Sequence, residues 1–220
     1  DHPGVPNSRL VQDNSPLATR YKGKSVAEQN SVDIAWQMLM SKDYNALRNA
    51  ICPTAQELKR FRQLVVNAVM ATDILDKDIV QLRNDRWERA FSESSLEESS
   101  RDKQNRKATI VIEHLIQASD VAHTMQHWNI YVKWNERLFE ELYKAYQSGR
   151  SEKDPSSFWY EGELAFFDFY ILPLARKLNE CGVLGESSDE YLNYALKNRA
   201  EWESEGREVV ASMVEKYGSA

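Results

Sequence analysis

The chain has 220 residues, of which 42% are hydrophobic and 28% charged, and its formal net charge is −6. This length supports a full hydrophobic core, and no apolar run approaches the roughly 20 residues that cross a bilayer, so we expect a cytoplasmic domain. The negative charge disfavours binding along a nucleic-acid backbone. A small anionic substrate can still bind if divalent metal ions reverse the sign of the local field.

Helical periodicity dominates the chain, and no segment shows the apolar–polar alternation of a half-buried strand. The prolines and glycine of the opening segment DHPGVPN favour turns over a regular helix. Helices are expected, in chain order, from Ser25 onward, over 43–51, from a capping box at Thr54 to about Asp73, over 76–91, 107–119, 126–147 and 158–178 with a bend at Pro173, and from about Ser188 to about Tyr217. The polar run between residues 92 and 107 is expected to be a mobile loop. The sequence therefore predicts one all-α unit.

An aspartate and two histidines lie where two of these predicted helices meet. Asp120, His123 and His127 have the spacing i, i+3 and i+7, which would place them on one face of a continuous helix. That pattern is a candidate metal site, but it also arises by chance. Two interpretations stay open from spacing alone: a local Asp-His-His metal site, or histidines that are exposed or bonded within the core.

Several segments, in order, resemble the catalytic domain of the 3',5'-cyclic nucleotide phosphodiesterases. They are DHPGVPN, SPLATRYKGKSVAEQN, VVNAVMATD, ASD followed by YVKWNERLFEEL, and FFDFYILPL. The family hallmark reads His-Asp-x-Asp-His-Pro-Gly, and this chain begins at its second aspartate, so Asp1 and His2 match. The resemblance implies a compact helical HD-type domain, N-terminally truncated, with residues 1–220 as the C-terminal part of one catalytic domain.

The resemblance also assigns metal-site roles. Asp120 falls on the remaining direct ligand of the tighter ion, zinc in most members. His2, Glu28 and Thr72 match positions that hold metal-bound waters, mainly around a second ion, magnesium or manganese. The general acid of the family lies upstream of residue 1, so no catalytic acid is expected within this chain.

A nucleotide pocket is implied by further matches. Leu138 and Phe166 match the two apolar residues that clamp the purine ring, and His123 replaces an asparagine that lines the pocket. Glu163 stands where most members carry a glutamine that faces the purine edge. An ionised glutamate only accepts hydrogen bonds, which favours cGMP or dual use as a hypothesis. Another departure is Asn30-Ser31, where the family has paired histidines.

The implied function is hydrolysis of cAMP or cGMP, or of both, to 5'-nucleoside monophosphates in signal transduction by hydroxide held between two divalent ions. The chain alone is expected to be inactive. Two alternatives stay open: a non-catalytic phosphodiesterase-like module that senses a nucleotide, and an all-α scaffold held only by its core. The expected partner is a cyclic nucleotide. Homodimer formation is left open, and membrane association is expected only through segments outside this chain.

Overall fold

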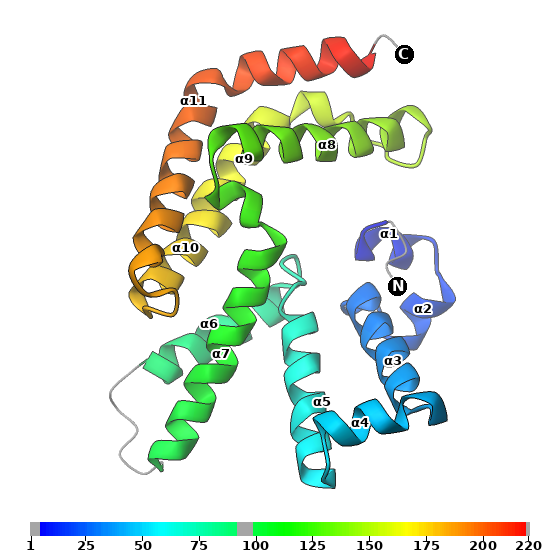
Figure 1. The fold of residues 1–220 in the computed structure, drawn as a ribbon. Coiled ribbons are helices and arrows are strands. Elements are labelled where there is room, and N and C mark those ends of the chain that lie inside the picture. The colour runs from blue at the N-terminus through cyan, green and yellow to red at the C-terminus, as the bar shows by residue number, and fades with distance from the viewer. Residues whose placement is uncertain (1–4, 92–98, 219–220) are drawn as a thin grey trace. The chain divides into compact units, whose positions relative to one another are not determined.

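The computed structural model describes residues 5–91 and 99–218. In this part of the chain every regular element is helical and no strand occurs, which confirms the all-α prediction (Figure 1). The chain divides into two compact units, with the boundary between Gln117 and Ala118. The expectation of one catalytic-domain piece over 1–220 stays a prediction. No helix within the described ranges is both long enough and apolar enough to cross a membrane.

The first unit is built from short helices followed by three longer ones. They are α1 (Asn7–Gln12), α2 (Pro16–Arg20), α3 (Val26–Met40), the 3-10 turn η1 (Lys42–Tyr44), α4 (Asn45–Ile51), α5 (Ala55–Met70), α6 (Lys77–Phe91) and α7 (Ser100–Asp120), whose last residues belong to the second unit. Leu10 of α1, Ala18 of α2 and Val26 of α3 form a small buried cluster. The sequence did not predict α1 or α2, because each is only about one turn long and gives no clear periodicity.

The start of α5 follows the sequence closely. The Thr54 hydroxyl accepts from the backbone N–H of Glu57 at 3.2 Å, and the Glu57 carboxylate accepts from the backbone N–H of Thr54 at 2.9 Å. Both bonds of the capping box are therefore present.

The start of α7 differs from the prediction. The expected loop over 92–107 is wrong in its later part, because α7 begins at Ser100, whereas residues 92–98 lie outside the described residues. The Ser99 hydroxyl accepts from the backbone N–H of Asp102 at 3.2 Å and so caps the first turn. Arg, Lys and Gln are good helix formers, so a solvated first turn needs no apolar stripe.

The second unit packs its helices around one aromatic core. Its elements are η2 (Ala122–Met125), α8 (Trp128–Gln147), η3 (Pro155–Ser157), α9 (Trp159–Phe166), the π-helical turn η4 (Phe167–Ile171), α10 (Leu172–Glu180), η5 (Gly185–Ser187) and α11 (Ser188–Gly218). The fully buried side chains of Tyr131, Phe139, Phe167 and Trp202 form the centre of this core. The Asn198 amide of α11 donates to the backbone carbonyls of Thr124 and Gln126, which ties η2 to α11.

The predicted helix over 158–178 is interrupted by a π-helical turn, not by a simple bend. Pro173 has no N–H, and its ring would meet the carbonyl of the residue four positions earlier in a regular helix. The widened turn of η4 directly precedes it and accommodates this clash. Turns of this kind are frequent at functional sites. Phe166, a predicted nucleotide contact, is the last residue before the widened turn.

Candidate functional site

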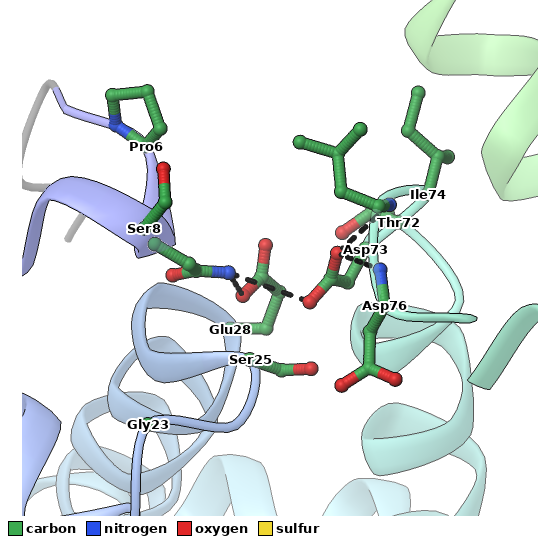
Figure 2. A pocket seen from close by; sticks show the side chains of 11 residues that line it. Pro6, Ser8, Gly23, Ser25, Glu28, Thr72, Asp73, Ile74 and Asp76 are labelled. Atoms are coloured by element: carbon green, nitrogen blue, oxygen red, sulfur yellow. Dashed lines mark hydrogen bonds between the residues drawn. The ribbon is translucent and has the colours of Figure 1, made fainter. Parts of the chain in front are cut away.

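An acidic pocket lies in the first unit, between the beginning of α3 and the loop that follows α5. The cavity measures about 370 Å³ and is lined by residues of three segments: Pro6, Asn7, Ser8, Gly23, Ser25, Glu28, Thr72, Asp73, Ile74, Leu75 and Asp76. Figure 2 shows the carboxylates of Glu28 and Asp73 directed toward one another across this space. The pocket contains two predicted metal-water positions, Glu28 and Thr72. The third, His2, lies outside the described residues.

Asn7 links the walls of this pocket. Its Oδ1 accepts from the backbone N–H of Ala27 at 2.9 Å, in the first turn of α3. Its Nδ2 donates to Glu28 Oε2 at 2.8 Å and, over a longer 3.4 Å, to Asp73 Oδ2 (Figure 2). The Asp73 Oδ1 atom accepts from the backbone N–H groups of Leu75 and Asp76, each at 3.1 Å. One neutral amide therefore holds two carboxylates in place.

We expect Asn7→Asp to lower the free energy of unfolding by about 1–3 kcal/mol, because it keeps the acceptor for Ala27 but sets a third carboxylate against Glu28 and Asp73. Added magnesium or manganese should restore part of the loss by offsetting the clustered charge. Thermal unfolding with and without the metal measures both effects. Asn45→Asp, which places a carboxylate beside the Arg48 guanidinium, is the control. Equal melting temperatures for Asn7→Asp and the natural protein would contradict the prediction.

Another pocket residue supports a hydrated cation here. The Ser25 side chain is 2% exposed, and its hydroxyl oxygen has no hydrogen-bond partner among the described residues. Ser25 also adopts a left-handed backbone conformation with φ of 37°, which costs energy in a residue other than glycine. Carboxylate, hydroxyl and amide oxygens are the ligands that magnesium and manganese prefer, often through water. The donor set of this pocket therefore fits a hard divalent ion.

Asp120 is the last residue of α7, as the sequence predicted for a position where two helices meet. The Asp120 carboxylate receives no hydrogen bond or ion pair from the described part of the chain. It also stands at the negative end of the helix dipole, where a cation is favoured and an anion is not. Desolvation by burial raises the pKa of Asp120. The surroundings of this carboxylate therefore suit a bound cation.

The local Asp-His-His arrangement on one helix is wrong. Since α7 ends at Asp120, His123 lies in η2 and His127 forms the N-cap of α8, where its Nδ1 accepts from the backbone N–H of Asn129 at 3.4 Å. Over residues 5–91 and 99–218, no group of three His, Cys, Asp or Glu side chains is arranged to hold a metal ion. Asp120 is therefore a single ligand candidate, not the centre of a local cluster.

A line of hydrogen bonds ends at Glu163 in the second unit. The Trp159 indole Nε1–H donates to Asn135 Oδ1 at 3.0 Å, and Asn135 Nδ2 lies 3.5 Å from the Tyr131 hydroxyl oxygen. The Tyr131 hydroxyl donates to Glu163 Oε2 at 2.8 Å. Tyr131 is fully buried and Asn135 is 2% exposed, so these bonds are shielded from water. Three side chains thus position the predicted purine-facing residue.

The ionisation of Glu163 differs from the expectation based on its residue type. Desolvation by burial raises the pKa of Glu163 from 4.5 to about 7, against the lowering effect of the Tyr131 and Asn135 side chains. Burial also raises the pKa of Tyr131, and the charge of Glu163 adds to that rise, so the phenol keeps its proton. At neutral pH both forms of the Glu163 carboxyl are populated. A protonated carboxyl can donate a hydrogen bond as well as accept one.

The remaining predicted nucleotide contacts lie in the same unit. The His123 ring is parallel to the Tyr131 ring, with centroids 6.3 Å apart, so His123 and Glu163 flank the same tyrosine. Burial lowers the pKa of His123, which favours its neutral form. Phe166 is half-buried and stacks on Tyr170 at 5.3 Å. Leu138 is 47% exposed and follows Ile130 and Trp134 along one exposed side of α8.

Sequence reasoning missed the residues that orient the others. Asn7, Tyr131 and Asn135 lie within segments that carry the family resemblance, but neither they nor Trp159 were given a role, because their roles depend on partners distant in the chain. One signal was present, because Asn135 interrupts the apolar stripe of its helix. A buried amide in such a stripe needs a hydrogen-bond partner.

Comparison with solved structures defines the class of fold. The phosphodiesterase domain of the RhoPDE fusion protein from the choanoflagellate Salpingoeca rosetta aligns with 100% of this chain and 66% of that chain, with a TM-score of 0.70 and 20% identity. A second structure of the rhodopsin phosphodiesterase domain from Salpingoeca rosetta aligns with 98% of this chain and 65% of that chain, with a TM-score of 0.72 and 20% identity. The chain therefore has the all-α fold of a phosphodiesterase domain.

The family follows from sequence similarity. The model of the 3'5'-cyclic nucleotide phosphodiesterase family matches residues 1–189, and the chain belongs to this family. A probable 3',5'-cyclic phosphodiesterase (pde-3) of Caenorhabditis elegans is 25% identical over 93% of this chain and 30% of its own length. The cGMP-inhibited 3',5'-cyclic phosphodiesterase 3A of Rattus norvegicus is 30% identical over 66% of this chain and 12% of its own length. The chain thus spans less than a third of either curated relative.

Proposed function

We propose that the full-length protein hydrolyses the 3' ester of cAMP, of cGMP or of both, giving 5'-nucleoside monophosphates. The family match over residues 1–189 carries this proposal. The two candidate regions described above support it, since one offers oxygen ligands to cations and the other offers apolar and hydrogen-bonding contacts to a purine. Signal transduction is the proposed context, because the substrate is a cyclic nucleotide.

Two divalent ions, zinc and magnesium or manganese, are proposed as cofactors. Asp120 would hold the tighter ion directly, while Glu28 and Thr72 would orient water around the other. When bound, the ions acidify water for attack and neutralise charge on the phosphoryl oxygens. The Thr72 hydroxyl donates its proton to the Val69 carbonyl at 2.7 Å, so its oxygen would accept a hydrogen bond from a metal-bound water. Asn7 keeps Glu28 in place.

The purine is proposed to bind in the second unit. Leu138 and Phe166 would contact its faces, because apolar contact supplies affinity where hydrogen bonds cannot. Glu163 would read its edge, and His123 would lie beside the base or the phosphate. None of these residues supplies the proton for the leaving 3' oxygen, and we place that general acid upstream of residue 1.

The isolated 220 residues are expected to show no turnover of cAMP or cGMP even with zinc and magnesium added, because the general acid and further metal ligands are absent from them. A general acid alone contributes about 10²–10⁴-fold. Product formation by the chain and by the full-length protein, measured by chromatography, tests this. The full-length protein should hydrolyse at least one cyclic nucleotide. Turnover by the isolated chain would show that the assignment of the general acid is wrong.

A second candidate is a nucleotide sensor that does not cleave its ligand. The observation that favours it is Glu163 in place of the usual glutamine. Saturable binding of a cyclic nucleotide to the full-length protein, with no product formed in the presence of both metals, would select this alternative.

A further inference from the structure

A second cavity of the first unit, the arginine pocket, has walls from α5, α6 and α7. It measures about 350 Å³, and its arginines are Arg60 of α5, Arg86 of α6 and Arg106 of α7. It shares no lining residue with the acidic pocket. No carboxylate within the described ranges lines it. Since the whole chain has 34 acidic and 28 basic residues, this pocket is a local excess of positive charge.

The amides of the arginine pocket present donors to it. A guanidinium can only donate, and Arg60 Nη2 donates to Asn105 Oδ1 at 2.8 Å, so the amide nitrogen of Asn105 remains as a donor. On α5, Asn67 Oδ1 accepts from Gln63 Nε2 at 2.7 Å, which leaves Asn67 Nδ2. Neither amide nitrogen has an acceptor in the part of the chain that the structure describes. Both can therefore donate to a ligand.

Arg86 is held by a buried carboxylate that does not line the pocket. Its Nη2 lies 2.7 Å from Glu113 Oε1, and the two side chains are 28% and 3% exposed. Arg83 also acts electrostatically on the Glu113 carboxylate. The positive charge at the pocket therefore exceeds the negative charge that Glu113 supplies. Glu113 orients the Arg86 guanidinium, whose other N–H groups remain donors.

We propose that the arginine pocket binds the phosphate group of a small ligand, at a site separate from the proposed catalytic one. Guanidinium groups match phosphate oxygens with paired, charge-assisted hydrogen bonds, and the amides of Asn67 and Asn105 add neutral donors. The cavity is within the range of roughly 300–1,000 Å³ that small-molecule sites occupy. Leu64 lines it as well and offers an apolar contact. The pocket therefore accommodates a free phosphate ion or a small phosphate monoester.

The test is thermal unfolding of the full-length protein at increasing concentrations of inorganic phosphate or glycerol phosphate, at constant ionic strength. A ligand that binds only the folded state raises the melting temperature, and the concentration dependence gives an apparent dissociation constant. Phosphate also stabilises folded proteins by exclusion from their surface, and it can bind at a catalytic metal. Those contributions are common to the natural protein and to variants of the arginine pocket, so the comparison between them reports this site.

Two variants change the pocket in different ways. Arg60→Gln removes one guanidinium, while the new amide can still donate to Asn105. The apparent dissociation constant for phosphate should rise at least about tenfold, as expected for the loss of one charge-assisted hydrogen bond. Asn67→Asp keeps the side-chain size and the acceptor for Gln63 but places a carboxylate among the arginines. It should raise the melting temperature without phosphate and abolish the phosphate-dependent rise that this site causes.

Arg62→Gln is the matched control, because it makes the same substitution on the same helix. The Arg62 guanidinium lies over the Trp36 ring, 5.4 Å from its centroid, and Arg62 does not line the arginine pocket. This variant should keep the dissociation constant of the natural protein.

The outcomes decide the inference independently of turnover. Equal phosphate-dependent rises in the natural protein, Arg60→Gln and Asn67→Asp overturn it. A loss of affinity in Arg62→Gln as large as that in Arg60→Gln overturns it as well. The expected loss in Arg60→Gln and Asn67→Asp alone supports it, and the tighter of the two compounds shows whether the site takes the free ion or an ester. Failure of the hydrolase proposal leaves this result unchanged.

Discussion

Asp120→Ala in the full-length protein is expected to abolish binding of the tighter metal ion and to lower kcat by more than about 10²-fold. Changing a residue that merely supports a metal ligand already lowers metal affinity or activity about 10–100-fold. The reason is local. Asp120 ends a 21-residue helix whose dipole is negative at that end, and the described residues give its carboxylate no partner. This unpartnered position is why we expect a cation beside the carboxylate.

Metal content after dialysis, read by elemental analysis, measures the effect on Asp120 apart from activity. His127→Ala is the matched control, because His127 belongs to the same connection between helices but serves as the N-cap of α8. It should retain the ion and lose about 1 kcal/mol of stability at most. Loss of the ion from His127→Ala with retention in Asp120→Ala would favour the local histidine site instead.

The second large effect is a pH-dependent change in stability caused by Glu163. Its pKa is raised on folding, so the folded state holds the proton longer than the unfolded chain does, and stability present at low pH is lost as pH rises from about 4.5 to about 7. A rise from 4.5 to about 7 corresponds to about 3 kcal/mol at 1.36 kcal/mol per pH unit. Glu163→Gln removes this loss, because glutamine does not ionise and still accepts from Tyr131.

The measurement is the difference in unfolding free energy between Glu163→Gln and the natural protein, by denaturant titration at about pH 4.5 and about pH 8. This difference should shift by up to about 3 kcal/mol in favour of the variant at the higher pH. Taking the difference cancels the contributions of the other titrating groups, such as Glu113, which is 2% exposed and whose pKa burial raises. Glu161→Gln should show a shift below about 0.5 kcal/mol. A pH-independent difference for Glu163→Gln would show that the natural carboxyl is not desolvated.

Local signals in the sequence predicted most of the long helices, and the errors have local causes. The capping box at Thr54 predicted the start of α5, because both of its bonds join residues three apart. The beginning of α7 was misplaced because solvated helical turns and polar loops have similar compositions. The π-helical turn at η4 was read as a bend, because Pro173 signals that a helical bond is missing but not how the backbone adapts.

The candidate site also has a part that the sequence predicted and a part that only the tertiary structure decided. The order of the family motifs by itself identified the phosphodiesterase resemblance and drew attention to Asp120, Glu28 and Glu163, because residue type and spacing along the chain are properties of the sequence. The state of Glu163 was decided by tertiary structure alone. Its hydrogen-bond partner Tyr131 is 32 residues away, and its pKa depends on how much protein surrounds it. Desolvation and hydrogen bonds of this kind arise only when distant segments pack together, so the pKa of a carboxyl that sequence reasoning took to be ionised is raised to about 7 in the folded protein.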